Sequence, residues 1–241
     1  MSLLDSLDDE QREAASRLIG PTCILAGAGT GKTRTITHRI AYGIEQGYFA
    51  ANRVLALTYT NKAAAELRTR LRELGSGSVS VKTFHAAALS QLDYFWPQFA
   101  GVPVPAVIES KARLISQAAD SLSIRLDAAA VRDIASEIEW RKFSMLSLDD
   151  YEKLATSRPK VAGLSAEVLV QLQRGYEETK IASNRLDWED VLILTLGMLR
   201  AEPRALAHVQ QQYRFFTVDE YQDISPLQQR LINAWLGSRE E

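Results

Sequence analysis

The sequence has a single cysteine among its 241 residues, Cys23, so the chain can form neither an internal disulfide nor a multi-cysteine zinc site. This scarcity is typical of proteins in a reducing compartment. A basic excess is also missing, because the formal net charge is −2. A protein that coats nucleic acid through bulk positive charge needs such an excess. Any contact with nucleic acid is therefore expected to be local.

Long apolar runs and targeting signals are absent from the sequence as well. No apolar stretch approaches the roughly 20 residues that a membrane helix requires. The first ten residues, MSLLDSLDDE, lack the basic and then apolar order of a signal peptide. We therefore expect a cytoplasmic protein with no membrane partner. The composition that remains is ordinary for a globular protein, 46% hydrophobic, and suits one large domain or two small ones.

The N-terminal part of the chain alternates short apolar runs with amphipathic patterns. This is the rhythm of a parallel sheet covered by helices. Strands are predicted at residues 22–26, 54–57 and 79–82. Helices are predicted between them at residues 33–44 and 62–74, where apolar or alanine residues recur at three- and four-residue spacing.

The pattern changes over residues 103–183, where strand signals vanish and amphipathic helices follow one another. These helices are predicted at residues 111–121, 127–143, 148–157 and 165–181. The α/β pattern then resumes, with a helix at residues 188–199, an apolar strand at 214–218 and a last helix at 227–236. The sequence thus predicts an all-helical insertion within an α/β domain.

The segment CILAGAGTGKT, residues 23–33, follows a predicted strand and opens a predicted helix. This is the context of a phosphate-binding loop. Glycines let the backbone curl so that N–H groups point at phosphate oxygens, and the helix N-terminus adds positive potential. Lys32 would then reach the β- and γ-phosphates of ATP, and the Thr33 hydroxyl would ligate Mg²⁺. Ala26 departs from the strict pattern, which begins with glycine. The alternative is a glycine-rich turn that binds no ligand.

A second metal-holding group is predicted where the strand at residues 214–218 ends, in RFFTVDEYQD. Asp219 would hold Mg²⁺ through its water shell, and Glu220 is placed to take a proton from the attacking water. An isolated Asp-Glu pair is usually a solvated turn. The apolar strand before this pair favours a metal site instead.

Six short segments carry a more specific pattern. They are LDDEQREA at 7–14, AGAGTGKT at 26–33, ALTYTNKAAAEL at 56–67, VKTFHA at 81–86, LDWEDVL at 186–192 and VDEYQDISPLQ at 218–228. In this order they resemble motifs of the UvrD/Rep/PcrA group of superfamily one DNA helicases. The family's form of the loop includes the alanine. The last segment resembles its D-E-x-Q-D motif, with Tyr221 for the commoner phenylalanine and Ile224 for the commoner threonine.

The resemblance implies an α/β fold of the P-loop NTPase class, a RecA-like parallel sheet with helices on both faces. It places the ATP-binding lobe at residues 1–104 and 184–241, and an inserted helical subdomain at 105–183. The implied cofactors are ATP and Mg²⁺. The implied cofactor contacts are Gln11, Gly27, Ala28, Gly29, Thr30, Gly31, Lys32, Thr33 and Arg34. Thr33 and Asp219 are the implied metal ligands, and Lys32 and Glu220 the catalytic residues.

Two of these residues have plainer alternatives. The Gln11 amide suits an adenine edge, but Gln11 lies three residues after Asp8 and could be the back-bonding partner in a capping box. Arg34 either approaches a phosphate or lies on the helix surface.

The resemblance also implies contacts with single-stranded DNA. The predicted DNA-contacting residues are Thr58, Tyr59, Thr60, Asn61, Thr83, Phe84 and His85. Their hydroxyl, amide and aromatic groups can hold phosphates and stack on bases. The alternative is an N-cap for the next helix, and for Thr60 or Asn61 both roles are compatible. Gln222 and Asp223 would link the nucleotide state to the hold on DNA. The indole rings of Trp140, Trp188 and Trp235 are predicted to be core.

The implied function is the motor lobe of an ATP-dependent helicase that moves 3′ to 5′ on single-stranded DNA, or at duplex junctions, in repair or recombination. Repair proteins are then candidate partners. Such motors have a second RecA-like lobe, which supplies arginines and which this chain lacks, so we expect ATP binding with feeble hydrolysis. The alternatives are the motor part of a helicase–nuclease, a nucleotide- and DNA-binding module without turnover, and a small-molecule kinase. The kinase leaves the TYTNK and TFH segments without a role.

Overall fold

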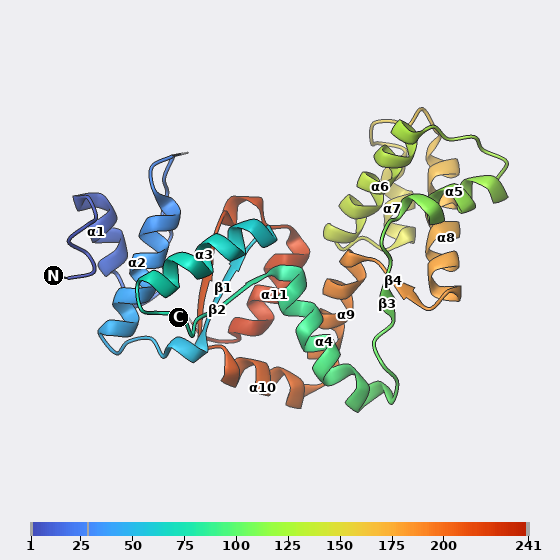
Figure 1. Ribbon diagram of the computed structural model, residues 1–241. Coiled ribbons are helices and arrows are strands. Elements are labelled where there is room, and N and C mark those ends of the chain that lie inside the picture. The colour runs from blue at the N-terminus through green and yellow to red at the C-terminus, as the bar shows by residue number, and fades with distance from the viewer. Residues whose placement is uncertain (1, 28, 240–241) are drawn as a thin grey trace. The chain divides into compact units, whose positions relative to one another are not determined.

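The computed structural model describes residues 2–27 and 29–239, and the chain divides into two compact units (Figure 1). Unit 1 comprises Met1–Ala87, Met198–Ile224 and Leu231–Glu241. Unit 2 comprises Ala88–Gly197 and Ser225–Arg230.

A parallel sheet lies at the centre of unit 1. Its strands are β1 (Val54–Thr58), β2 (Ser80–Thr83) and β5 (Phe215–Val218), in the order β2-β1-β5. All five residues of β1 are buried, as expected for a parallel strand covered on both faces. Leu57 pairs with Val218 and Thr58 with Thr83, so the carboxyl ends of the three strands meet at one edge. The predicted α/β fold with a parallel sheet is confirmed.

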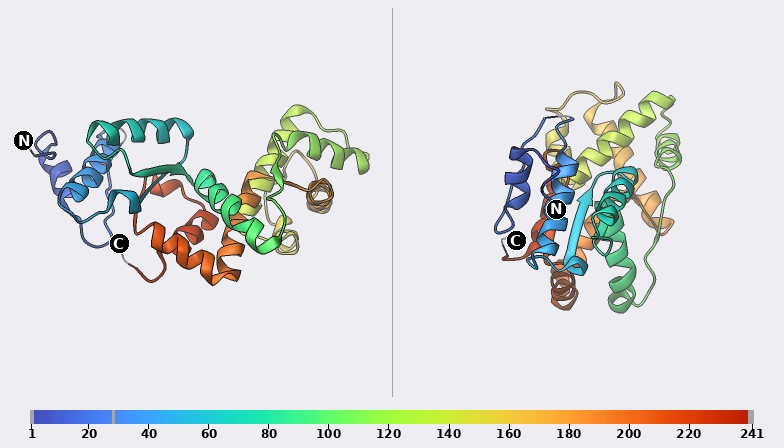
Figure 2. Two further views of the ribbon diagram at one scale, coloured as in Figure 1. Left: turned by 60° about the horizontal axis from the view of Figure 1, so that its bottom comes forward. Right: turned by 60° about the vertical axis from the view of Figure 1, so that its left-hand side comes forward.

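Helices accompany the sheet in unit 1. They are α1 (Asp9–Ser16), α2 (Lys32–Glu45), α3 (Asn61–Glu73) and α10 (Pro203–Gln212), with 3₁₀ turns at η1 (Ala51–Arg53) and η2 (Tyr221–Asp223). α1 packs against α2. α2 contacts α3, and α3 also contacts β1 and β2 (Figure 2). Ile40 of α2 and Leu67 of α3 are buried with Val54 and Val81 in one apolar cluster. The helical spacing read from the sequence therefore marks the faces that these helices bury.

The predicted strand at residues 22–26 is wrong. The structure shows no strand between residues 21 and 27. Cys23 is exposed, and so is Leu25, at 91% of its surface. An apolar run forms a strand only where neighbouring strands and a buried face stabilise it. In the part of the chain that the structure describes, this segment pairs with no strand, and only Ile24 of its apolar side chains packs against the core of unit 1.

Unit 2 is built on four helices, each near its predicted range. They are α5 (Ala112–Ser121), α6 (Ala128–Phe143), α7 (Leu148–Ala155) and α8 (Ala166–Ala182). Asp127, Ser147 and Ser165 precede three of them, and each side chain accepts a backbone N–H of the first turn. A short parallel ladder, β3 (Ala106–Val107) with β4 (Arg185–Leu186), accompanies the helices and was not predicted.

Three further helices contribute residues to both units. They are α4 (Phe84–Ala100), α9 (Trp188–Ala201) and α11 (Pro226–Leu236). The prediction that Trp235 is core is confirmed, but Trp140 and Trp188 are 37% and 44% exposed. Trp140 lies beneath the Arg158 guanidinium, which is 3.3 Å from the ring centroid. A cation thus covers this ring from outside the core. Among the described helices, none is long and apolar enough to cross a membrane.

Candidate nucleotide site

The glycine-rich loop leads into α2 through two residues in the left-handed region. Gly29 has φ 77° and Gly31 has φ 85°, conformations that glycine adopts without strain. Gly31 is the N-cap of α2, and among the described residues no side chain caps it. The first N–H groups of α2 are therefore available to an anion. Ala28, another predicted cofactor contact, lies outside the described residues.

Among the described residues, the hydrogen-bond partners of Lys32 are backbone carbonyls of the loop. Its Nζ donates to the Ala26 oxygen at 3.3 Å and to the Gly27 oxygen at 3.4 Å. Both bonds are long for a charged donor, which prefers about 2.7–2.9 Å to an anionic oxygen. A phosphate oxygen would be a stronger partner than either carbonyl. Thr33 follows in the first turn of α2 and is half-buried.

Gln11 reaches the loop from α1. Asp8 caps α1 by accepting the Gln11 backbone N–H at 2.8 Å, while the Gln11 side-chain Nε2 donates to the Thr30 carbonyl oxygen at 3.0 Å. The side chain is therefore not a capping-box partner. The positive φ of Gly31 favours glycine, and an added Cβ would lie 2.8 Å from the Nε2 at the flexible end of the Gln11 side chain, which would have to move.

Arg34 is turned away from the loop. Its Nη2 donates to the Ser6 carbonyl oxygen at 2.6 Å, which ties α2 to the N-terminal segment. The structure thus brings Gln11, Lys32 and Thr33 together around the loop but holds the Arg34 side chain elsewhere.

Asp219 extends the pairing of β5 by one residue, because its N–H donates to the Leu57 carbonyl oxygen at 2.9 Å. Only 7% of Asp219 is exposed. Burial, and then the charge of Glu220, raise the pKa of the Asp219 carboxyl above its ordinary value, while the charge of Lys32 opposes them. A buried carboxylate in this condition gains from a nearby cation. Asp219 therefore has the chemistry of a metal-holding residue.

Glu220 has φ 50°, a left-handed conformation that costs a non-glycine residue about 1–3 kcal/mol. Its Oε2 accepts a bond from the Gln222 Nε2 at 2.6 Å. The same nitrogen donates to the Asp223 Oδ2 at 3.2 Å. Strain of this kind is concentrated at functional sites, and here it occurs at the predicted general base.

The predicted DNA contacts divide into exposed and enclosed groups. Thr60 and Asn61 are exposed, and the Thr60 hydroxyl also caps α3 by accepting the Ala63 N–H at 3.0 Å. Tyr59 and His85 are half-buried. The enclosed side chains are Thr58 at 1%, Thr83 at 7% and Phe84 at 1% exposure.

Phe84 lies inside an aromatic stack and has no surface to offer a base in this structure. Its ring centroid is 6.2 Å from that of Tyr59 and 6.4 Å from that of Trp235. The buried Phe84 ring therefore packs against the half-buried Tyr59 ring from the core. The helical spacing of Phe84, Ala87 and Ala88, all buried, is a core signal that could have been recognised in the sequence.

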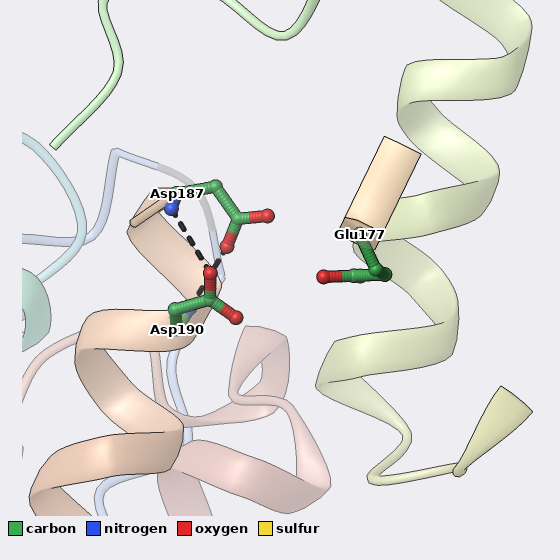
Figure 3. A group of neighbouring side chains, drawn as sticks. All are labelled: Glu177, Asp187 and Asp190. Carbon is green, nitrogen blue, oxygen red and sulfur yellow. Dashed lines mark hydrogen bonds between the residues drawn. The ribbon is translucent and has the colours of Figure 1, made fainter. Parts of the chain in front are cut away.

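A second group of charges, not predicted from the sequence, lies in unit 2. Glu177 of α8 points toward Asp187 and Asp190 at the start of α9, and their oxygens lie within 4.8 Å of one another (Figure 3). Lys142 Nζ lies 2.5 Å from Asp187 Oδ2 and 2.7 Å from Asp190 Oδ1. Lys180 contacts all three acids. Two ammonium groups thus take the place that a metal ion would need.

A family model described as the UvrD/REP helicase N-terminal domain matches residues 7–241. The chain belongs to this family. The resemblance inferred from the six motifs is thereby confirmed.

The relatives point the same way. ATP-dependent DNA helicase UvrD2 of Mycobacterium tuberculosis is 41% identical over 250 residues, which cover 99% of this chain and 36% of that protein. ATP-dependent DNA helicase PcrA of Leuconostoc citreum is 32% identical over 238 residues, covering 96% of this chain and 31% of that protein. The chain spans about a third of the length of these relatives.

Proposed function

We propose that the chain is the ATP-binding motor lobe of an ATP-dependent DNA helicase. Its relatives carry that name. The observation that carries the proposal is the electrostatic interaction between the start of α2 and the carboxylate that follows β5. The uncapped start of α2, with Lys32, lies close enough to the buried Asp219 for its charge to influence that carboxyl. We propose residues 1–104 and 184–241 as the lobe and 105–183 as its helical subdomain.

In this proposal the loop binds the triphosphate. The N–H groups at the start of α2 and the Lys32 ammonium hold phosphate oxygens, and Gln11 meets the adenine edge. Thr33 and Asp219 would hold Mg²⁺, which neutralises charge on the phosphates. The residues fit such an ion because Asp219 is buried with a raised pKa.

Glu220 is proposed to act as the general base. Its carboxylate takes a proton from the attacking water while Lys32 stabilises charge on the γ-phosphate. Tyr59, Thr60, Asn61 and His85 would contact single-stranded DNA at the same edge of the sheet, and Thr58, Thr83 and Phe84 would support them. Movement 3′ to 5′ and a role in repair belong to this proposal.

Hydrolysis by the chain alone is expected to be slow. In motors of this kind a second lobe supplies arginines to the γ-phosphate, and such arginines accelerate related reactions by about 10³–10⁵-fold. The proposal therefore expects ATP binding by these 241 residues and rapid turnover only in the whole protein.

The test compares Glu220→Gln with Glu45→Gln, an exposed glutamate of α2, in the whole protein. Glu220→Gln is expected to keep ATP affinity and to lower DNA-stimulated hydrolysis by about 10²–10⁴-fold. Glu45→Gln should change neither. Undiminished turnover in Glu220→Gln would remove this residue as the base. If the unsubstituted whole protein binds ATP and DNA but never hydrolyses ATP, the protein is a binding module and not a motor.

A further inference from the structure

α2 has two faces that pack against different parts of unit 1. Ile40 is buried in the apolar cluster that includes residues of the strands. Arg34, His38 and Tyr42 recur every four residues, so they lie along another face of the helix. All three contact the segment at residues 2–16, which we call the N-terminal arm. The arm consists of a turn followed by α1.

Arg34 and His38 both hold Ser6 of the arm. The Arg34 Nη2 donates to the Ser6 carbonyl oxygen at 2.6 Å, and the His38 Nε2 lies 3.2 Å from the Ser6 Oγ. The His38 Nδ1 lies 2.8 Å from the Arg34 carbonyl oxygen, which can only accept a hydrogen bond. In the neutral ring Nδ1 is therefore the donor, and Nε2 accepts the Ser6 hydroxyl. Because His38 is buried, these two bonds fix the orientation of its ring.

Apolar contacts and a second arginine tie the arm together. Tyr42 of α2 packs against an apolar cluster of the arm, which consists of Leu4, Leu7 and Ala15. Arg12 of α1 donates to two carbonyl oxygens of the turn, that of Leu4 at 3.4 Å and that of Leu7 at 3.0 Å. The turn and α1 are thus bound to each other. A contact that holds the turn therefore also limits the movement of α1.

α1 places the Gln11 side chain at the loop. The helix has eight residues, and a helix this short is marginally stable in water without tertiary contacts. Its position therefore depends on its packing against α2 (Figure 1). From this position the Gln11 Nε2 donates to the Thr30 carbonyl oxygen at 3.0 Å. A shift of α1 along α2 would move the Gln11 amide relative to the loop.

We propose that His38 is a positioning residue for the choice of nucleotide base. Its bond to Ser6 holds the arm on α2 and thereby sets where the Gln11 amide lies. Hydrogen bonds weaken steeply outside a narrow range of distance and angle, so a displaced amide loses its preference for adenine. The proposed phosphate contacts, the start of α2 and Lys32, do not belong to the arm. The inference rests on the proposed function, in which Gln11 meets the adenine edge.

The test measures how the whole protein distinguishes adenine from guanine. Calorimetric titration with Mg²⁺ gives the Kd values of the β,γ-imido analogues of ATP and GTP, which carry the same phosphates. In the unsubstituted protein the ratio of the GTP-analogue Kd to the ATP-analogue Kd should be about 5–150, the discrimination that one bidentate amide contact supplies. His38→Ala should lower this ratio by about 2–10-fold, the effect of one hydrogen bond, through weaker binding of the ATP analogue. The Kd of the GTP analogue should stay within about twofold, because contacts at independent sites contribute additively.

Three further variants test the path from His38 to the base. Ser6→Ala removes only the hydroxyl of an exposed residue and should lower the ratio as His38→Ala does. His38→Gln places an amide near the position of Nε2 and should retain most of the ratio. In a Gln11→Ala background, His38→Ala should change the ratio no further, because both substitutions act on the same contact.

The matched control is Ile40→Val, which removes one methyl group from a fully buried residue of the same helix. This substitution lowers stability on the face of α2 that packs with residues of the strands, away from the arm. It should leave the ratio of the two Kd values unchanged.

The failures of this experiment are distinguishable. If Gln11→Ala lowers the ratio but His38→Ala and Ser6→Ala do not, the positioning role of His38 is overturned and the proposed function stands. Equal weakening of both analogues in His38→Ala would also overturn that role, because a merely structural histidine affects every nucleotide alike. A ratio that Gln11→Ala leaves unchanged would overturn the proposed adenine contact. If the unsubstituted protein binds neither analogue, the proposed ATP binding itself is wrong.

Discussion

Lys142 with Asp187 in unit 2 and Lys32 with Asp219 in unit 1 differ in how fully their charges are paired. In unit 2 the Lys142 Nζ lies 2.5 Å from Asp187, and only 3% and 1% of these two side chains are exposed. In unit 1 the half-buried Lys32 has two backbone carbonyls at 3.3 and 3.4 Å. The first lysine already has acidic partners. Lys32 lies beside a loop whose backbone N–H groups are available to bind an anion.

The pKa values of Asp187 in unit 2 and Asp219 in unit 1 are shifted in opposite directions. Burial alone would raise the pKa of Asp187, but the charges of Lys142 and Lys180 outweigh it and hold the pKa well below its ordinary value. Burial and the charge of Glu220 raise the pKa of Asp219. A completed ion-pair network thus stabilises the fold of unit 2, while an incomplete one in unit 1 is suited to a ligand.

The largest expected effect is on stability. Lys142→Met should lower the free energy of unfolding by about 3–5 kcal/mol, because buried carboxylates lose a partner. Urea unfolding followed by tryptophan fluorescence measures it. The control is Glu13→Gln, which removes an exposed pair with Arg17 and should cost less than about 1 kcal/mol. Equal losses in the two variants would show that the buried network contributes no more than a surface pair.

Lys32→Met makes the same chemical change in unit 1 and should act on ligand binding instead. We expect a loss of about 1.5–3 kcal/mol in ATP binding free energy, the range for hydrogen bonds to charged groups. The unfolding free energy without nucleotide should stay within about 0.5 kcal/mol. Calorimetric titration and urea unfolding give both values. A loss of stability as large as that of Lys142→Met would show that Lys32, like Lys142, stabilises the fold.

The pH dependence of stability follows from the shifted pKa values of Asp187 and Lys180 in unit 2. Because the pKa of Asp187 is lowered, its contribution is complete above the ordinary value of about 3.9 and is lost as pH falls through the lowered one. The pKa of Lys180 is raised by Asp187 and its neighbours against the effect of burial. The contribution of Lys180 to stability is complete below about pH 10.4 and is lost as the pH rises through the raised pKa.

The stability difference between the unsubstituted chain and Asp187→Asn should therefore be constant from about pH 5 to 9 and shrink below about pH 4. Urea unfolding across this range measures it. A difference that changes steadily through neutral pH would contradict the charge states assigned to this network.

The smallest expected effect is the change in unfolding temperature on substituting Asp219. Its raised pKa means that the folded, nucleotide-free chain carries an unfavourable carboxylate at pH 7. Asp219→Asn should therefore raise the unfolding temperature without ligand, by about 1–4 °C. Thermal unfolding by circular dichroism measures the change. A clear fall in the unfolding temperature would show that Asp219 stabilises the fold instead.

The sequence was informative where local pattern decides structure. The turn at Gly31, the cap at Thr60 and the buried strand of β1 each depend on residues a few positions apart, and each appears in the structure. Burial of Phe84 was missed, although its helical spacing was readable. α4 and α10 were not predicted at all.

Other features depend on distant residues, and local patterns do not contain them. Lys142 and Asp187 are 45 positions apart, so their ion pair leaves no periodic signal. The segment at residues 22–26 reads as a strand, but its exposure depends on which elements pack beside it. The Asp223 charge likewise raises the pKa of Tyr59, after burial, because β1 and β5 are neighbours in the sheet.

The most direct test of the central claim is calorimetric titration of this chain with ATP, in Mg²⁺ and in EDTA. The account predicts one ATP per chain, bound more tightly with Mg²⁺, and loss of that Mg²⁺ effect in Asp219→Asn. No binding, or the same affinity in Mg²⁺ and EDTA for the unsubstituted chain, would contradict a nucleotide site formed by the loop before α2 and the carboxylate after β5.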